Sequence, residues 1–530
     1  MKQRDLLYCC GILWLAAGMP LCAADTYRVA GVVVDSENGA PLANVRVALA
    51  PTAAPAAEVV RMTSAGGGFA FDVPQGEFRI LAESGGIRQV FGEQVPGTGL
   101  GSSIFTGPDQ DTSKLVFRWH RPAAISGKVV DDAGDPVERA HVQVLRSIVT
   151  MGKRNVRTAA WAWTDDLGEY RVAPILAGTY YIAVTGQPWY SQAQAPKMQG
   201  SVAEAFGYAP VYYSNTADAG RAAALVVVPG QEATADFAVS PVPGVTLRVT
   251  CDGPPVTKTL RLINDGILGS ESVPRTVPMP LNAATLVGVP AGRYFVDLMS
   301  TAGGSILVAR QAIEIGGVDA DVQLKLVPPA AVTGTVTWDS PASTPRGSLL
   351  VRLIRSNFEA TFPAAVRADG SFQIPAVLAG AYEVAIYSKG NRLAAQIHSE
   401  AVASDGLLHA DNGADINVRI TVSDQVGGVK GLVIQDGQPA PGVFAVLMPR
   451  RERLLPGDSR AYQTDSDGSF NWQDIPAGDY FLFATRDTQL EYSNPAVLQP
   501  FLPEAKLVHV DLHGTLNERI PLADTGNTKR

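Results

Sequence analysis

One short pattern recurs along this 530-residue chain and constrains its fold more than any single residue does. A glycine is followed two residues later by an aromatic residue, and a second such pair begins ten residues after the first. The clearest copies are Gly168-Glu169-Tyr170 with Gly178-Thr179-Tyr180, Gly370-Ser371-Phe372 with Gly380-Ala381-Tyr382, and Gly468-Ser469-Phe470 with Gly478-Asp479-Tyr480. Looser copies begin at Gly68 and Asn282. Self-similarity of this kind indicates an array of similar modules, in which many conspicuous residues serve the scaffold.

Each copy of the pattern is typical of tight turns that join short strands. The pairs Asp369-Gly370 and Asp467-Gly468 suit a turn because glycine adopts positive φ without strain. The aromatic residue that follows then begins a strand and faces inward. In the third copy Asn282 takes the place of the first glycine, and we expect left-handed backbone there because asparagine tolerates it well.

Runs of alternating apolar residues surround every copy, and this period of two is the signature of strands. Two runs precede each pattern and one follows it. The first runs are 31–35, 127–131, 247–251, 334–338 and 431–435; the second are 45–49, 142–145, 260–263, 350–354 and 444–448; the last are 114–118, 235–239, 321–325, 417–421 and 517–521. Few charged residues (18%) and abundant Gly (52) and Pro (37) favour strands and turns over helices.

The chain is therefore expected to be all-β, a tandem array of about five antiparallel β-sandwich modules. The expected division is a signal peptide at 1–24, then modules at 25–121, 122–241, 242–329, 330–422 and 423–530. The second module carries an aromatic-rich insert, and the third is divergent. Linkers are short, for example 121–123, which predicts a stiff, rod-like string of modules.

The order of strand, Gly-x-Pro turn, strand, Asp-Gly-x-Phe and Pro-Ala-Gly-x-Tyr resembles the carboxypeptidase regulatory-like domain family over nearly the whole chain after residue 24. The segment 208–216 resembles an insert common in exported bacterial members with several repeats. The resemblance implies a transthyretin-like, or carbohydrate-binding-like, sandwich fold. It implies little about function, because one fold serves many functions. The zinc ligands of a carboxypeptidase's catalytic domain have no counterpart here.

The N-terminus reads as an export signal. Lys2 and Arg4 precede an apolar run, and Cys22 and Ala24 are the small residues preferred before a cleavage site, which we place before Asp25. No later stretch is apolar enough to cross a bilayer. We expect an exported protein that is periplasmic, associated with the outer membrane or extracellular.

Several classes of function are disfavoured. The formal net charge is −8 and no basic stripe occurs, which argues against nucleic acid as a partner. No serine elbow, phosphate-binding loop, dinucleotide fingerprint or zinc motif is visible, so we expect no enzyme, no cofactor and no metal. Cys251 is the one cysteine left after the signal, which excludes an intramolecular disulfide.

One aromatic group in the second module stands out as a candidate ligand site. Its members are Trp161, Trp163, Trp189, Tyr190, Tyr212 and Tyr213. Trp161 and Trp163 lie two apart and so share one strand face. Flat rings with a polar edge suit stacking on the faces of sugar rings. The alternative is that the insert folds back and its rings pack against their own sandwich.

Two functions remain open. The first is a non-catalytic exported protein with a binding or display role at the cell envelope, with carbohydrate as the ligand and a glycan or envelope protein as the partner. The second is a purely structural spacer or assembly partner of an envelope complex, with no small-molecule ligand.

Overall fold

The computed structural model describes residues 25–523, except for 53–55, 109, 151, 189–205, 254–255, 257, 265–274, 302–304, 341–347, 356–360, 389–390, 452–453 and 455–456. The proposed export signal, 1–24, lies outside the described residues. Strands dominate, as the composition predicts. Helix in the described part of the chain is limited to α1 (Pro495–Leu498) and the 3₁₀ turns Ala219–Arg221 and Gln499–Phe501.

The strands are grouped below by the five proposed modules, which we number 1 to 5 along the chain. Module 1 holds β1 (Thr26–Asp35), β2 (Arg46–Pro51), β3 (Val59–Met62), β4 (Gly68–Pro74), β5 (Gly76–Ser84), β6 (Ile87–Val90), β7 (Ile104–Thr106) and β8 (Leu115–Trp119). Module 2 holds β9 (Ala123–Val130), β10 (His141–Thr150), β11 (Lys153–Trp163), β12 (Glu169–Ile175), β13 (Gly178–Gly186), β14 (Phe206–Tyr212), β15 (Leu225–Val227), β16 (Glu232–Thr234) and β17 (Phe237–Ala238). Module 3 holds β18 (Pro241–Asp252), β19 (Lys258–Asn264), β20 (Arg275–Met279), β21 (Ala283–Pro290), β22 (Gly292–Ser300), β23 (Leu307–Ile315) and β24 (Ala320–Lys325).

The two C-terminal modules complete the array. Module 4 holds β25 (Ala330–Trp338), β26 (Leu349–Arg355), β27 (Thr361–Ala365), β28 (Ser371–Val377), β29 (Gly380–Ser388), β30 (Asn391–Arg392), β31 (Ala395–His398), β32 (Leu408–Ala410) and β33 (Asp415–Val422). Module 5 holds β34 (Val426–Gln435), β35 (Gln438–Pro439), β36 (Phe444–Pro449), β37 (Arg460–Gln463), β38 (Ser469–Pro476), β39 (Gly478–Thr485), β40 (Lys506–Val510) and β41 (Thr515–Pro521).

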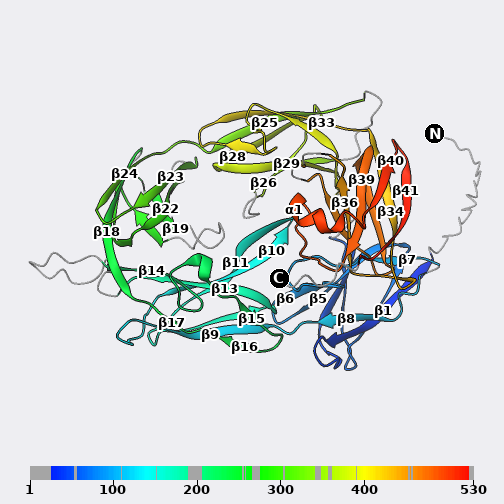
Figure 1. The fold of residues 1–530 in the computed structure, drawn as a ribbon, viewed down its shortest axis with the longest axis horizontal. Coiled ribbons are helices and arrows are strands. Elements are labelled where there is room, and N and C mark those ends of the chain that lie inside the picture. The colour runs from blue at the N-terminus through cyan, green and yellow to red at the C-terminus, as the bar shows by residue number, and fades with distance from the viewer. Residues whose placement is uncertain are drawn as a thin grey trace, which may run out of the picture.

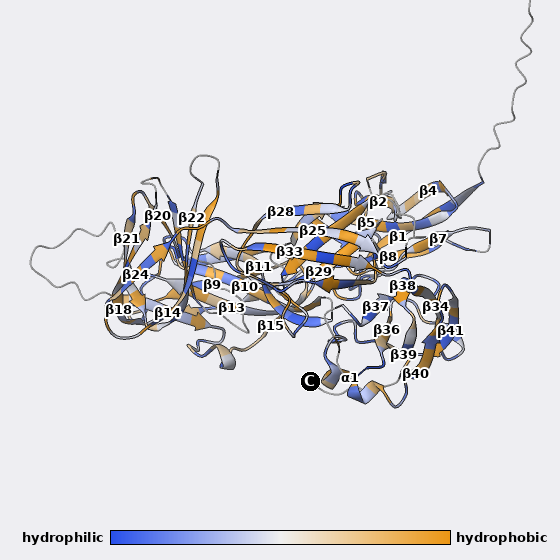
Figure 2. Ribbon diagram, turned by 90° about the horizontal axis from the view of Figure 1, so that it is seen from above, coloured by the Kyte–Doolittle hydropathy of each residue, from blue (hydrophilic) through white to orange (hydrophobic). Residues whose placement is uncertain are grey.

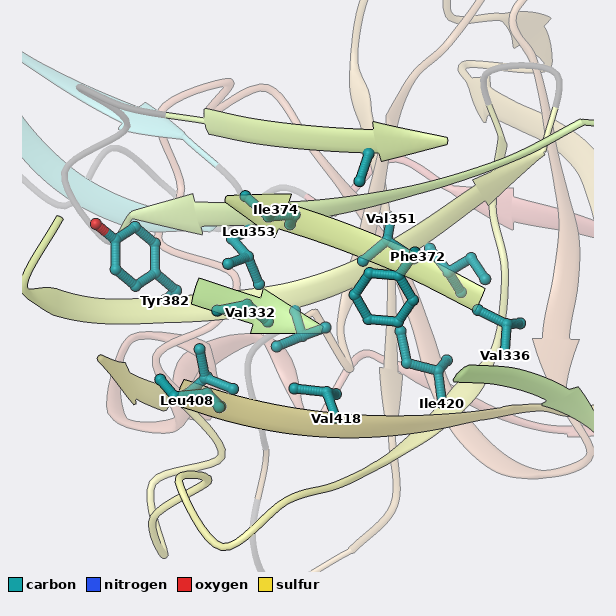
Figure 3. Close-up of a cluster of buried hydrophobic side chains, with 14 of the residues drawn as sticks. Val332, Val336, Val351, Leu353, Phe372, Ile374, Tyr382, Leu408, Val418 and Ile420 are labelled. Carbon is teal, nitrogen blue, oxygen red and sulfur yellow. The ribbon is translucent and has the colours of Figure 1, made fainter. Parts of the chain in front are cut away.

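Each module packs two sheets around its own cluster of buried apolar side chains. In module 4 one sheet has the order β28-β25-β33-β31, and the facing sheet contains β27, β26, β29 and β30. Figure 3 shows Phe372, Val332 and Val418 of the first sheet lying toward Leu353 and Tyr382 of the second. The alternation of apolar and polar residues that produces these one-sided sheets is visible as banding along the strands in Figure 2. The prediction of tandem β-sandwiches is confirmed.

Most strand pairs are antiparallel as predicted, but every module also contains parallel pairing. Its first strand pairs in parallel with its closing strands: β1 with β8, β9 with β16 and β17, β18 with β24, β25 with β33, and β34 with β41. The chain therefore enters and leaves each module in the same sheet but at opposite ends, so one module can follow another.

The recurring pattern has the structural role that its residues suggest, with one exception. Gly168, Gly370 and Gly468 have φ values of +73°, +82° and +78°, which confirms the glycine turns. Asn282 is not among the described residues with positive φ, so that prediction is wrong. Its side chain instead donates to the Gly253 carbonyl (2.9 Å) and accepts from the Lys258 ammonium (2.8 Å), which satisfies a buried cation.

The tyrosine of the pattern closes a local hydrogen bond. The Tyr382 hydroxyl donates to the Leu378 carbonyl four residues before it, at 2.8 Å. Tyr180, Tyr294 and Tyr480 make the equivalent bond to residues 176, 290 and 476. Burying the ring while satisfying its hydroxyl lets a polar aromatic residue begin a core strand.

The modules do not form the rod that the short linkers predict. Figure 1 shows them following a closed circuit, in which module 5 returns to module 1. The Gln463 side chain donates to the Gly92 carbonyl at 2.6 Å, and the Ser102 hydroxyl donates to the Thr464 carbonyl at 2.9 Å. Module 5 also contacts module 2, where Arg154 pairs with Glu491 at 2.7 Å. Contacts between modules that are distant in sequence set the overall shape, and linker length does not reveal them.

Modules 2 and 3 are joined by a strand. The first residues of β18 pair with β14, whereas later residues pair with β21 and β24. One sheet thus runs from β11 through β10, β13, β14 and β18 to β21. A hinge at this junction would have to break strand pairing, so the junction is stiff.

Candidate functional site

The two tryptophans at the end of β11 lie on an open surface of module 2. β11 is the edge strand of its sheet, next to β10. Ala160 and Ala162 pack against the module core, so strand alternation turns Trp161 and Trp163 to the opposite face. Their exposed fractions are 55% and 53%. Two large rings held in this way on a regular strand offer a rigid, half-exposed aromatic surface.

A histidine beneath these rings completes the surface. His141 on β10 lies directly opposite Trp163, and its ring centroid is 4.6 Å from that of Trp163 and 5.7 Å from that of Trp161. It is 4% exposed, and neither ring nitrogen has a hydrogen-bond partner among the described residues. Burial lowers the pKa of His141 to about 4, so the imidazole is neutral at pH 7. We call His141, Trp161 and Trp163 the aromatic face.

Sequence reasoning missed His141. The residue stands at the start of a strand, 22 positions from Trp163, and only the register of β10 on β11 brings them together. That register contains an irregularity at Val144 and Leu145, which pattern counting does not reveal.

A cleft of about 600 Å³ adjoins the aromatic face at Trp163. Its titratable lining residues are Lys128, Asp165, Glu169, Tyr170, Arg171, Glu232 and Asp236. Arg171 lies 3.2 Å from Glu232, and the Tyr170 hydroxyl donates to a backbone carbonyl at 2.6 Å. Hydrogen bonds from Ser126 and Arg171 hold the pKa of Glu232 below its usual range. The cleft thus presents an excess of carboxylates, with two cations among them.

The remaining predicted residues lie elsewhere. Tyr212 is 5% exposed and packs in a cluster with Leu145 and Ala183, next to Ala219 and Ala222 of the segment that follows β14. Tyr213 packs on the core ring of Phe237, with centroids 6.4 Å apart. These two rings therefore fold back on their own module, as the alternative interpretation predicts. Trp189 and Tyr190 lie outside the described residues.

Module 5 has a face equivalent to the aromatic face, and there it is covered. Thr164 and Thr464 occupy equivalent positions. The Thr164 hydroxyl donates to the Val137 carbonyl and accepts from the Ala140 amide, and the Thr464 hydroxyl donates to the Ala440 carbonyl and accepts from the Val443 amide. Gln463 therefore corresponds to Trp163, and it binds Gly92 of module 1. The same surface of the sandwich thus docks a protein segment in module 5 and is open at the tryptophans of module 2.

The described residues contain no group of three or more His, Cys, Asp or Glu side chains placed to hold a metal ion. Cys251 is buried in module 3. Among the helices of the described residues, none has the length and hydropathy needed to cross a bilayer.

Comparison with known proteins gives structural likeness only. No family model matches the chain, so its resemblance to the carboxypeptidase regulatory-like family stays a prediction. No curated protein matches either. Solved structures that resemble it include the Bacillus anthracis TIE protein (14% identity, 75% of this chain and 74% of that one, TM-score 0.17). Others are GBS52, the minor pilin of Streptococcus agalactiae (14%, 41% and 97%, 0.22), and BcpA, the major pilin subunit of Bacillus cereus (12%, 76% and 99%, 0.14). At these TM-scores no function transfers to this chain.

Proposed function

We propose that this chain is a non-catalytic exported protein of the cell envelope, and that it binds carbohydrate at the aromatic face of module 2. The export signal predicted at residues 1–24 and the resemblance of the repeats to a carbohydrate-binding-like fold support this assignment. The recurrent glycines and aromatic residues of the all-β scaffold serve turns and cores. The repeated motif is thus explained by structure without catalysis, which favours a binding role.

The half-exposed ring of Trp163, which lines part of the adjoining cleft, carries the proposal. A sugar ring has an apolar face of C–H groups and a polar rim of hydroxyls. The indole would stack on the apolar face. The carboxylates of Asp165 and Glu169 and the cation of Arg171 would bond the hydroxyls, which both donate and accept. Because the indoles project from a strand within a regular sheet, little side-chain order has to be gained on binding.

A glycan array and polysaccharide pull-downs with the chain from Asp25 onward test the proposal. Trp161→Ala and Trp163→Ala are expected to abolish retention of a bound glycan. Leu512→Ala is a matched control, because Leu512 is 51% exposed in module 5. Absence of glycan binding by folded wild-type chain, or equal binding by all three variants, would reject the proposal.

The second candidate function is assembly with an envelope protein. The specific observation in its favour is the equivalence of the aromatic face to the covered face of module 5, where Gln463 binds a segment of module 1. A photo-crosslinking residue at position 163 would distinguish the two functions. A discrete protein adduct that is lost with Trp161→Ala supports assembly, whereas glycan retention without an adduct supports carbohydrate binding.

A further inference from the structure

The contact between modules 1 and 5, which we call the seam, brings together segments more than 360 residues apart. The Ser103 amide donates to the Asp465 carboxylate at 2.9 Å, and the Ser466 amide donates to the Ser103 carbonyl at 3.2 Å. Ser102 and Gln463 add the two bonds already described. The seam is therefore a short ladder of polar contacts built on the turn that begins with Asp465.

Asp465 is a buried carboxyl group in the middle of this seam. It is 1% exposed and forms no ion pair with any described residue. Its two oxygens accept from the Ser103 amide and from the Tyr462 hydroxyl, the latter at 2.8 Å. The charged groups that act on it are Glu77, on β5 of module 1, and Asp467, in its own turn. A charge on Asp465 would thus be buried near two further carboxylates.

The same turn in module 2 shows how this aspartate behaves when nothing covers it. Asp165 is exposed, and one of its oxygens accepts from the Leu167 and Glu169 amides at 3.0 and 2.8 Å. Asp465 begins an identical turn, since its amide donates to the Ser469 carbonyl as that of Asp165 donates to Glu169. Asp465 differs from Asp165 in being covered by a segment of module 1 and in accepting from Tyr462, where module 2 has Ala162.

We propose that the seam is a proton-controlled closure, in which the ring of modules is held closed while the Asp465 carboxyl carries a proton and loosens when that proton is lost. The protonated carboxyl still accepts from Ser103 and can donate to the Tyr462 oxygen, so both contacts survive. The ionised form keeps both bonds but adds a buried charge that faces Glu77 and Asp467. Loosening would also dismantle a cleft of about 650 Å³ that both modules line, with Glu77 and Phe105 on one side and Asp467 and Asn471 on the other.

The direction and size of the effect follow from linkage. Burial, with repulsion from Glu77 and Asp467, raises the pKa of Asp465 from 3.8 to about 7. The closed form therefore binds the proton more tightly than the open form. Closure is strongest below about pH 4, weakens as the pH rises to about 7, and stays at its weakest above that. With a pKa of about 7 in the closed form and 3.8 in the open form, the equilibrium constant for closure falls by about a hundredfold between pH 5 and pH 8.

Amide hydrogen exchange at Ser103 and Ser466 measures closure directly, because both amides donate across the seam. The protein is the chain from Asp25 onward, and exchange rates are corrected for the intrinsic effect of pH. We expect wild-type protection at these two amides to fall by about a hundredfold from pH 5 to pH 8. Asp465→Asn, which has the same shape without a charge, should stay protected throughout this range.

Two variants keep the test specific. Asp165→Asn makes the same change in the uncovered turn and should leave the pH response of the seam as in wild type. Glu77→Gln removes one facing carboxylate and should make the loss of amide protection between pH 5 and pH 8 smaller. This variant keeps the test available even if Asp465→Asn does not fold. Protection at core amides of β36 reports that each variant is folded. Wild-type protection at Ser103 and Ser466 that is the same at pH 5 and pH 8, or an unchanged fall in Asp465→Asn, would overturn the proposal.

Discussion

Replacing Gly334 by alanine would test the close approach on which each sandwich is built. Gly334 lies in β25, between Phe372 on the antiparallel neighbour and Val418 on the parallel neighbour. A Cβ atom at this position would lie 2.7 Å from ring carbons of Phe372. It would also clash with the Val418 carbonyl oxygen. Real Cβ atoms essentially never lie within 3.0 Å of such an atom, and this Cβ would lie far closer than that. A backbone carbonyl in the middle of a sheet cannot turn aside, so β33 itself would have to move.

We expect this change to destabilise module 4 by about 3 kcal/mol, the upper part of the usual range for overpacking. A unit of this size has an m value of roughly 1 kcal/mol per molar urea, so its unfolding midpoint should fall by about 3 M. The assay is urea unfolding of the full chain, followed by hydrogen exchange in peptides of β25, β28 and β33. Gly316→Ala is the control, because Gly316 has no positive φ and a Cβ there would meet nothing within 4 Å.

The control should change stability by no more than about 0.5 kcal/mol, as most surface substitutions do. A loss below that value for Gly334→Ala would refute the reasoning, because it would mean that β25 and β33 are not held at this spacing. Gly31, Gly127 and Gly431 meet the carbonyls of residues 115, 235 and 518 in the same way, so the conclusion extends to modules 1, 2 and 5.

Three further substitutions separate core from surface. Tyr382→Phe leaves the Leu378 carbonyl without its partner and should cost about 1 kcal/mol in urea unfolding of module 4; no change would mean that the bond contributes nothing. Trp472→Ala should lower the free energy of unfolding by about 3–5 kcal/mol, because Trp472 is 7% exposed and packs 5.1 Å from the Phe470 ring. Trp163→Ala should stay within about 0.5 kcal/mol when both variants are measured by urea unfolding, and an equal loss in both variants would contradict the assignment of Trp163 to a surface.

Much of the fold can be predicted from the sequence because the forces that set it are local. Alternation places Phe372 and Tyr382 on core faces, and positive φ requires Gly370 at its turn. Parallel pairing of the first and last strands is not local, since it joins segments such as β25 and β33 that lie about 80 residues apart. No residue type marks that pairing, apart from the glycine that makes room for the neighbouring carbonyl.

The candidate site likewise has features that local sequence predicts and features that long-range packing decides. The spacing of Trp161 and Trp163 correctly places them on one face, because strand period alone decides it. Whether that face is open or covered depends on which module lies against it. His141 joins the face through strand register, and Tyr212 leaves the surface because the segment after β14 folds onto it. These outcomes depend on long-range packing, which sequence spacing does not encode.

Asp165 and Asp465 are the clearest example of two residues that match in local sequence but differ in burial. Both begin an aspartate turn of the same repeat, and by sequence alone they are equivalent hairpin residues. One is exposed and the other is buried because module 1 returns to module 5. Ring closure, together with Asp467 where the other copy has Leu167, can thus turn a repeated scaffold residue into a group that titrates near neutral pH. In repeat proteins, copies that match in sequence but differ in burial are therefore the positions at which to look for function.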